Sequence, residues 1–110
     1  MIKDRIVRVK LKRHYAEQRP MSYVGKVTAF NDFWLAMEST GLLIARNQPN
    51  HVQIDKHRGA TLIPRDNIET IALLPDNFDV KDIRVTTEGQ QIQIEVTGAP
   101  NVYIGELGEG

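Results

Sequence analysis

The chain has 110 residues, of which 41% are hydrophobic and 25% charged, a composition typical of one small globular domain and not of a disordered segment. It contains no cysteine, which excludes a disulfide framework and a thiolate metal site. The formal net charge is zero, but residues 1–30 carry eight Lys or Arg against two acids, whereas residues 76–110 carry two against seven. This asymmetry indicates a basic face for an anionic partner, oppositely charged surfaces that meet between subunits, or simply an uneven scatter of surface charge.

The first predicted strand, residues 6–15, alternates between apolar and basic side chains. The apolar set is Val7, Val9 and Leu11, and the basic set is Arg8, Lys10, Lys12 and His14. Such period-two alternation is typical of a half-buried strand. We therefore expect an exposed basic stripe, which would either attract an anionic partner or protect a sheet edge from aggregation.

A second strand is expected over residues 23–30, after a turn that contains Arg19-Pro20. It ends in Phe30-Asn31-Asp32-Phe33-Trp34, which holds three of the seven aromatic residues of the chain. Asn and Asp favour turns. We expect Asn31 and Asp32 to form the turn, Phe30 and Trp34 to point into the core, and Phe33 to be exposed at the tip.

The rest of the chain is expected to consist of further short strands. A third strand begins at residue 34, and two more are predicted at residues 60–64 and 68–74, while the residues from 39 to 59 have no clear path. Residues 83–86 and 91–96 alternate around Glu88-Gly89, which predicts a hairpin. Residues 97–110 are rich in glycine and proline and are expected to form a loose tail. The fold class is therefore all-β, a small barrel or sandwich.

The residues offer little for catalysis. There is no cysteine nucleophile, no GxGxxG motif and no P-loop. His51, Asp55 and His57 would share one face of an extended strand and could bind a metal, or they could simply be solvated. We expect no enzyme and no cofactor. The basic stripe and the aromatic bend instead combine the two features of a single-strand nucleic-acid binder, a cationic track and stacking faces.

Two short stretches resemble the motifs of the Sm/LSm/Hfq family. Residues 25–33, Gly-Lys-Val-Thr-Ala-Phe-Asn-Asp-Phe, are similar to the first motif, in which a glycine precedes Phe-Asp and an aromatic or His. Residues 62–68, Leu-Ile-Pro-Arg-Asp-Asn-Ile, are similar to the Asp-Asn-apolar end of the second motif, with Pro64-Arg65 in place of its Arg-Gly pair. The resemblance covers about residues 5 to 74.

The resemblance implies a strongly bent five-stranded antiparallel Sm-like (SH3-like) barrel over residues 1–75. Residues 76–110 would then be a C-terminal β-hairpin extension and a flexible acidic tail, packed on the same domain. Edge strands of the family pair between protomers and close a homo-oligomeric ring. Family rings bind U-rich or A-rich RNA at the inner rim, so the expected partner is single-stranded RNA, or DNA. The alternative is a structural ring with no nucleic-acid role.

The resemblance also implies a binding set on the two motif loops, to which the basic strand adds an electrostatic track. Phe33 would take the base-stacking position and Asn31 the neighbouring polar one, with Arg65 close enough for phosphate or base contact. Leu35 stands where many Sm proteins place an asparagine that reads the base edge. The full expected set is Asn31, Asp32, Phe33, Arg65, Asp66, Asn67, Arg8, Lys10 and Lys12.

The expected location is cytoplasmic. The first five residues, Met-Ile-Lys-Asp-Arg, lack the apolar segment of a secretory signal, and no apolar run approaches the roughly 18 residues that cross a bilayer. We therefore expect no membrane partner.

Overall fold

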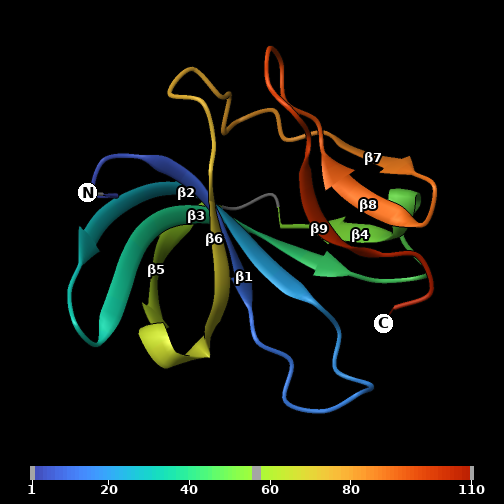
Figure 1. The fold of residues 1–110 in the computed structure, drawn as a ribbon, viewed down its shortest axis with the longest axis horizontal. Coiled ribbons are helices and arrows are strands. Elements are labelled where there is room, and N and C mark those ends of the chain that lie inside the picture. The colour runs from blue at the N-terminus through green and yellow to red at the C-terminus, as the bar shows by residue number, and fades with distance from the viewer. Residues whose placement is uncertain (1, 56–57, 110) are drawn as a thin grey trace.

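The computed structural model describes residues 2–55 and 58–109, and its regular elements are nine β-strands and two short 3-10 turns (Figure 1). The predicted all-β class is confirmed. The strands are β1 (Ile6–Leu11), β2 (Met21–Phe30), β3 (Trp34–Ile44), β4 (Val52–Ile54), β5 (Gly59–Pro64), β6 (Ile68–Leu73), β7 (Val85–Glu88), β8 (Gln91–Ile94) and β9 (Val102–Glu106). The 3-10 turns are η1 (Pro49–His51) and η2 (Arg65–Asn67).

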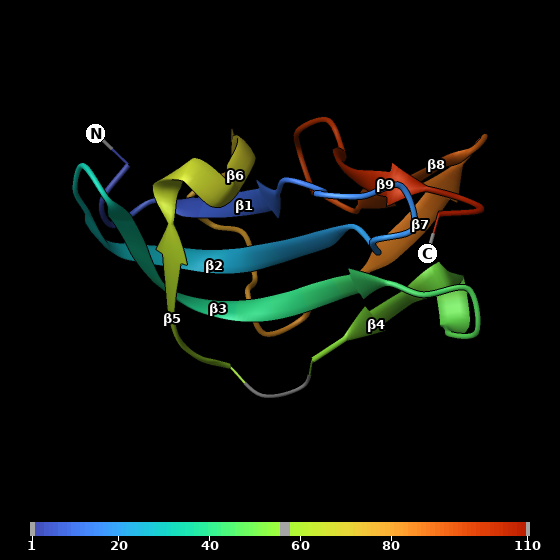
Figure 2. The same cartoon turned by 90° about the horizontal axis from the view of Figure 1, so that it is seen from below.

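The first six strands form one antiparallel sheet in the order β4-β3-β2-β1-β6. The long strand β3 shares its outer edge between two partners, since Leu42–Ile44 pair with β4 and Trp34–Ser39 pair with β5. Figure 2 shows β2 and β3 as long curved ribbons, with β5 and η2 at one end. Among the described residues β5 pairs only with β3 and β6 only with β1, so the strands do not close into the expected barrel.

The curvature of β2 depends on Gly25. This residue lies between Val7 of β1 and Ser39 of β3, and a Cβ atom built on it would be 1.8 Å from the carbonyl oxygen of Glu38. Such a distance is far inside van der Waals contact, so only glycine allows β3 to come this close. The β2–β3 register also shifts between Val27 and Ala29, which is typical of a bulge that bends the strand further.

The apolar side chains form two cores on the two faces of this sheet. The first lies inside the bend and consists of Val7, Val9, Val27, Leu35, Met37 and Ile63. The second lies between the sheet and the C-terminal strands and consists of Val24, Leu42, Ile44, Val52, Leu74, Ile92, Ile94 and Ile104. Residues on both sides of position 75 therefore contribute to one continuous core.

The C-terminal region forms a second antiparallel sheet, in the order β7-β8-β9. The predicted hairpin is confirmed as β7 and β8, which pair from Val85 with Ile94 to Glu88 with Gln91. The expected loose tail is wrong, because β9 pairs with β8 and buries Ile104 in the second core. The glycines and prolines around it form turns, while Val102, Tyr103 and Ile104 between them are good strand formers.

Candidate nucleic-acid interface

The β2–β3 loop is a tight turn held by Asn31. The side-chain Oδ1 of Asn31 accepts hydrogen bonds from the backbone N–H groups of Phe33 (2.9 Å) and Trp34 (2.8 Å). The Asn31 N–H in turn donates to the Trp34 carbonyl (3.0 Å). This is the local pattern by which Asn stabilises turns. The Phe33 side chain is consequently presented to solvent and is 76% exposed, as the sequence predicts.

The other two aromatics of the bend do not fill the core. Phe30 is 36% exposed and Trp34 is 42% exposed, so their expected inward orientation is wrong. For Trp34 the physical reason is the alternation of β3, in which Leu35 and Met37 occupy the buried positions. Trp34 therefore lies on the opposite face, where it pairs with Pro64 of β5. All three aromatics of the bend offer surface to a ligand.

Arg65 joins the two predicted binding loops. Its backbone N–H donates to the Phe33 carbonyl (2.9 Å), and its Nη1 donates to the Asn31 carbonyl (2.9 Å). Its guanidinium carbon lies 4.4 Å from the centroid of the Phe30 ring, a cation–π contact. Asp32 Oδ1 is 4.0 Å from Nη1. The structure thus brings together the residues expected in the first loop and Arg65 of η2, across an interval of more than thirty positions in the chain.

Asn67, at the other end of η2, contacts a third loop. Its carbonyl accepts a hydrogen bond from the backbone N–H of Lys12 (2.9 Å), and its Oδ1 lies 2.8 Å from His14 Nε2. Asp66, between Arg65 and Asn67, is exposed. In Figure 1 the β2–β3 loop, η2 and the β1–β2 loop lie along the same lower side of the molecule. Together these three segments form the candidate interface.

The expected basic stripe on β1 is largely absent. Arg8 and Lys10 are only 6% and 8% exposed. Lys10 Nζ forms an ion pair with Glu69 at 2.7 Å, and Arg8 Nη1 donates to Thr70 Oγ1 at 2.8 Å. Burial lowers the pKa of the Arg8 guanidinium, and the nearby Glu69 partly opposes that shift. Of the three predicted basic residues, Lys12 alone remains exposed.

The burial of Arg8 and Lys10 has a tertiary cause. β1 is an internal strand of its sheet, between β2 and the edge strand β6. Arg8 pairs with Val24, whose side chain belongs to the core that the C-terminal sheet completes. The face that would be exposed in an isolated sheet is therefore covered by β7–β9.

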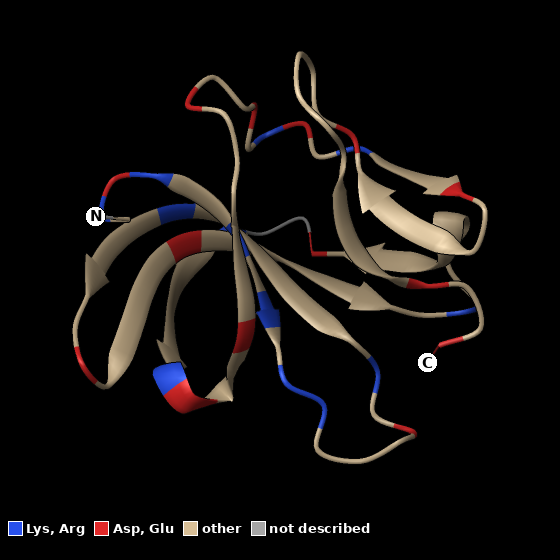
Figure 3. Ribbon diagram, viewed as in Figure 1, with Lys and Arg blue, Asp and Glu red and all other residues tan. Residues whose placement is uncertain are grey.

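Sequence reasoning placed Lys12 of the expected binding set on a strand and missed that it belongs to the β1–β2 loop. The expected strand to residue 15 ends at Leu11, and the loop contains Lys12, Arg13, His14 and Tyr15. The available signal was Arg13. It is basic where the alternation calls for an apolar residue, two positions after the strand ends at Leu11. Figure 3 shows positive charge in this loop and in η2, and negative charge at the tip of the β2–β3 loop and in η2.

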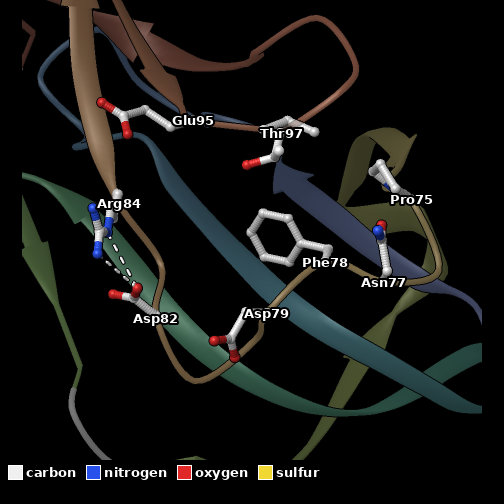
Figure 4. Close-up of a pocket in the computed structure, with 9 residues that line it drawn as sticks. Pro75, Asn77, Phe78, Asp79, Asp82, Arg84, Glu95 and Thr97 are labelled. Atoms are coloured by element: carbon white, nitrogen blue, oxygen red, sulfur yellow. Dashed lines mark hydrogen bonds and ion pairs between the residues drawn. The ribbon is translucent and has the colours of Figure 1, made fainter.

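A separate pocket of about 340 Å³ lies between the segment after β6 and the end of β8 (Figure 4). Phe78 contributes an aromatic ring to the lining, and Asp79, Asp82 and Glu95 contribute three acidic residues. The only cation in this lining, Arg84, is bound to Asp82 at 3.0 Å, and that hydrogen bond raises the pKa of its guanidinium. Because three acids repel phosphate, this pocket is not part of the candidate nucleic-acid interface.

The metal site considered at His51, Asp55 and His57 includes His57, which lies outside the described residues. Within residues 2–55 and 58–109, no three His, Asp or Glu side chains converge as metal ligands. The same residues include no helix long and apolar enough to cross a membrane.

Comparison with known proteins finds no matching family model, no significantly similar curated protein and no significantly similar solved structure.

Proposed function

We propose that the protein is an Sm-like ring protein that binds single-stranded nucleic acid, with RNA as the expected ligand, and serves RNA (or DNA) processing or chaperoning. The observation that carries this proposal is the exposed ring of Phe33 on a loop that Arg65 joins to the second loop similar to an Sm motif. Exposed aromatic faces and adjacent cations are the features by which proteins hold single strands. The protein would act by holding bases and phosphates, without bond chemistry.

The residues of this site would have different roles. Phe33 would stack on one base, and the partly exposed guanidinium of Arg65 would contact the neighbouring phosphate or base. Asn31 would act mainly through Phe33, because its Oδ1 already accepts two backbone hydrogen bonds. Asp66 and Asn67 would border the bound strand. Arg8 and Lys10 would not contact it, because both are buried.

Salt dependence tests the binding proposal. Fluorescently labelled U-rich and A-rich single-stranded RNA should bind with an affinity that falls steeply as the salt concentration is raised. The reason is that basic side chains of the protein displace the counterions condensed on the RNA phosphates. The expected slope of log K against log salt is about −0.7 for each phosphate contacted. Anisotropy titrations at several salt concentrations measure it, with a duplex of the same sequence as the control. Absence of binding to either single strand at low salt would refute the proposal.

The ring part of the proposal rests on the free edges of β5 and β6. Each of these strands pairs on one side only among the described residues, and Leu62 and Leu73 on them are exposed. Edge pairing between copies would satisfy the unpaired backbone groups and cover both leucines. We expect the native particle to have several times the 12.5 kDa mass of one chain. Leu62→Lys combined with Leu73→Lys should dissociate the particle to monomers.

Native mass spectrometry or light scattering measures this assembly. A wild-type monomer at micromolar concentration would show that the ring is wrong. A wild-type ring that does not retain RNA would instead favour the second candidate function, a structural assembly module. The exposed leucines on free edges are the observation that supports that candidate.

A further inference from the structure

We propose that the β1–β2 loop is a second binding site for the same nucleic-acid strand, in which Tyr15 stacks on a base and Lys12 contacts a phosphate. This inference rests on the proposed function and extends it from one nucleotide at Phe33 to a continuous stretch of single strand. Lys12 was expected as part of a basic strand, whereas Tyr15 and the β1–β2 loop itself were not among the expected binding elements.

The first argument is the exposure of an aromatic side chain on a basic loop. Tyr15 is 62% exposed, a fraction comparable with that of Phe33. The loop spans residues 12–20, which is longer than the roughly two to five residues of a usual hairpin connection. Long ordered loops on a rigid sheet often carry function. Around Tyr15 lies a shallow, widely open concave surface of about 540 Å³, lined by Lys12, Arg13, His14, Tyr15, Ala16 and Glu69.

The loop presents Tyr15 in a defined position. The backbone N–H of His14 donates to Gln18 Oε1 (2.6 Å), and the Gln18 N–H donates to the Tyr15 carbonyl (3.1 Å). Arg13 donates to the Ala16 carbonyl and forms an ion pair with Glu109 near the C-terminus. These contacts order the loop before a ligand arrives. A preorganised loop loses less conformational entropy on binding, so its aromatic ring is a better stacking surface.

The two aromatic positions are joined by η2. On one side of η2, Arg65 is hydrogen-bonded to the Phe33 carbonyl. On the other side, Asn67 contacts Lys12 and His14. Figure 1 shows the three segments on the same side of the molecule, so one strand could contact all three in order. The second site is therefore a continuation of the first and not an isolated patch.

The charges identify Lys12 as the phosphate contact. Arg13 is neutralised by Glu109, and Lys10 by Glu69. Lys12 is exposed and forms no ion pair with the described part of the chain. An exposed, unpaired ammonium beside an exposed aromatic ring suits a phosphate and the base attached to it.

The test compares two lengths of RNA. A labelled trinucleotide should occupy the Phe33 site alone, whereas an oligonucleotide of about 12 nucleotides falls within the range that single-strand binding folds cover. Tyr15→Ala should weaken binding of the longer RNA roughly 5- to 150-fold, as loss of one stacked base does, and leave the trinucleotide unaffected. Lys12→Gln should weaken the longer RNA and reduce its salt slope. Arg19→Gln is the matched charge control, because Arg19 is on the same loop but does not line the concave surface.

The outcomes separate this inference from the proposed function. If the wild type binds both RNAs and Tyr15→Ala binds both equally well, the second site is wrong and the Phe33 site stands. If Lys12→Gln and Arg19→Gln have equal effects on the longer RNA, the loop acts only through its general charge, and the second site is also wrong. If the wild type binds neither RNA, the proposed function fails and this inference fails with it. Thermal unfolding of each variant checks that these exposed substitutions leave the fold intact.

Discussion

Gly25→Ala is expected to destabilise the protein by at least about 3 kcal/mol, the upper end of the usual cost of overpacking. The added Cβ would lie 1.8 Å from the carbonyl oxygen of Glu38 and 2.8 Å from the Cα of Ser39. Both are backbone atoms, so no side chain can rotate away. β3 would have to move off β2 at the centre of the sheet, and the hydrogen bonds on both sides of Gly25 would be strained.

Gly59→Ala is the matched control for this substitution. A Cβ at Gly59 meets no atom within 4 Å, so the same chemical change should alter stability by no more than about 1 kcal/mol. Urea unfolding followed by circular dichroism measures both variants against the wild type. Equal midpoints for the two alanine variants would show that β2 and β3 do not approach as closely as the structure has them.

Phe33→Ala is expected to weaken RNA binding by about 1 to 3 kcal/mol, which corresponds to roughly a 5- to 150-fold higher Kd. The reason is the loss of the stacking face at the tip of the β2–β3 loop. Stability should change by less than about 0.5 kcal/mol, because the side chain is 76% exposed and contributes to neither core. Anisotropy titrations and urea unfolding of the same preparation measure the two effects.

Phe33→Tyr serves as the control for this experiment. It retains a six-membered aromatic face, so RNA should still bind with nearly wild-type affinity. A Phe33→Ala variant that binds RNA normally would remove the stacking role. A variant that instead unfolds more easily would show that the ring packs against protein, for example against another copy of the chain.

The geometry of the β2–β3 loop was predicted well, because local chemistry determines it. Asn31 favours a turn in any context, and the residue after Asp32 is then displayed at the tip, so exposure of Phe33 follows from the sequence. The meeting of the two loops was expected only through the resemblance to a known family. The structure supplies its physical basis in the hydrogen bonds of Arg65 to Asn31 and Phe33.

The predictions about which side of a strand faces water were less successful. Trp34 and Leu35 are both large and apolar, so composition alone does not decide which of them is buried. β3 buries Leu35 because Met37 shares its face, and Trp34 then points outward. The same difficulty affects Tyr15, which the alternation of β1 assigned to a strand that ends at Leu11.

The all-β class, the β7–β8 hairpin and the turn that displays Phe33 follow from the sequence alone. Each of these depends on interactions between near neighbours in the chain. Only the tertiary structure decided the environment of Arg8 and Lys10 and the strand at Val102–Glu106. Alternation in β1 shows that its two faces differ, but it cannot show that a second sheet, encoded at the far end of the chain, covers the basic one.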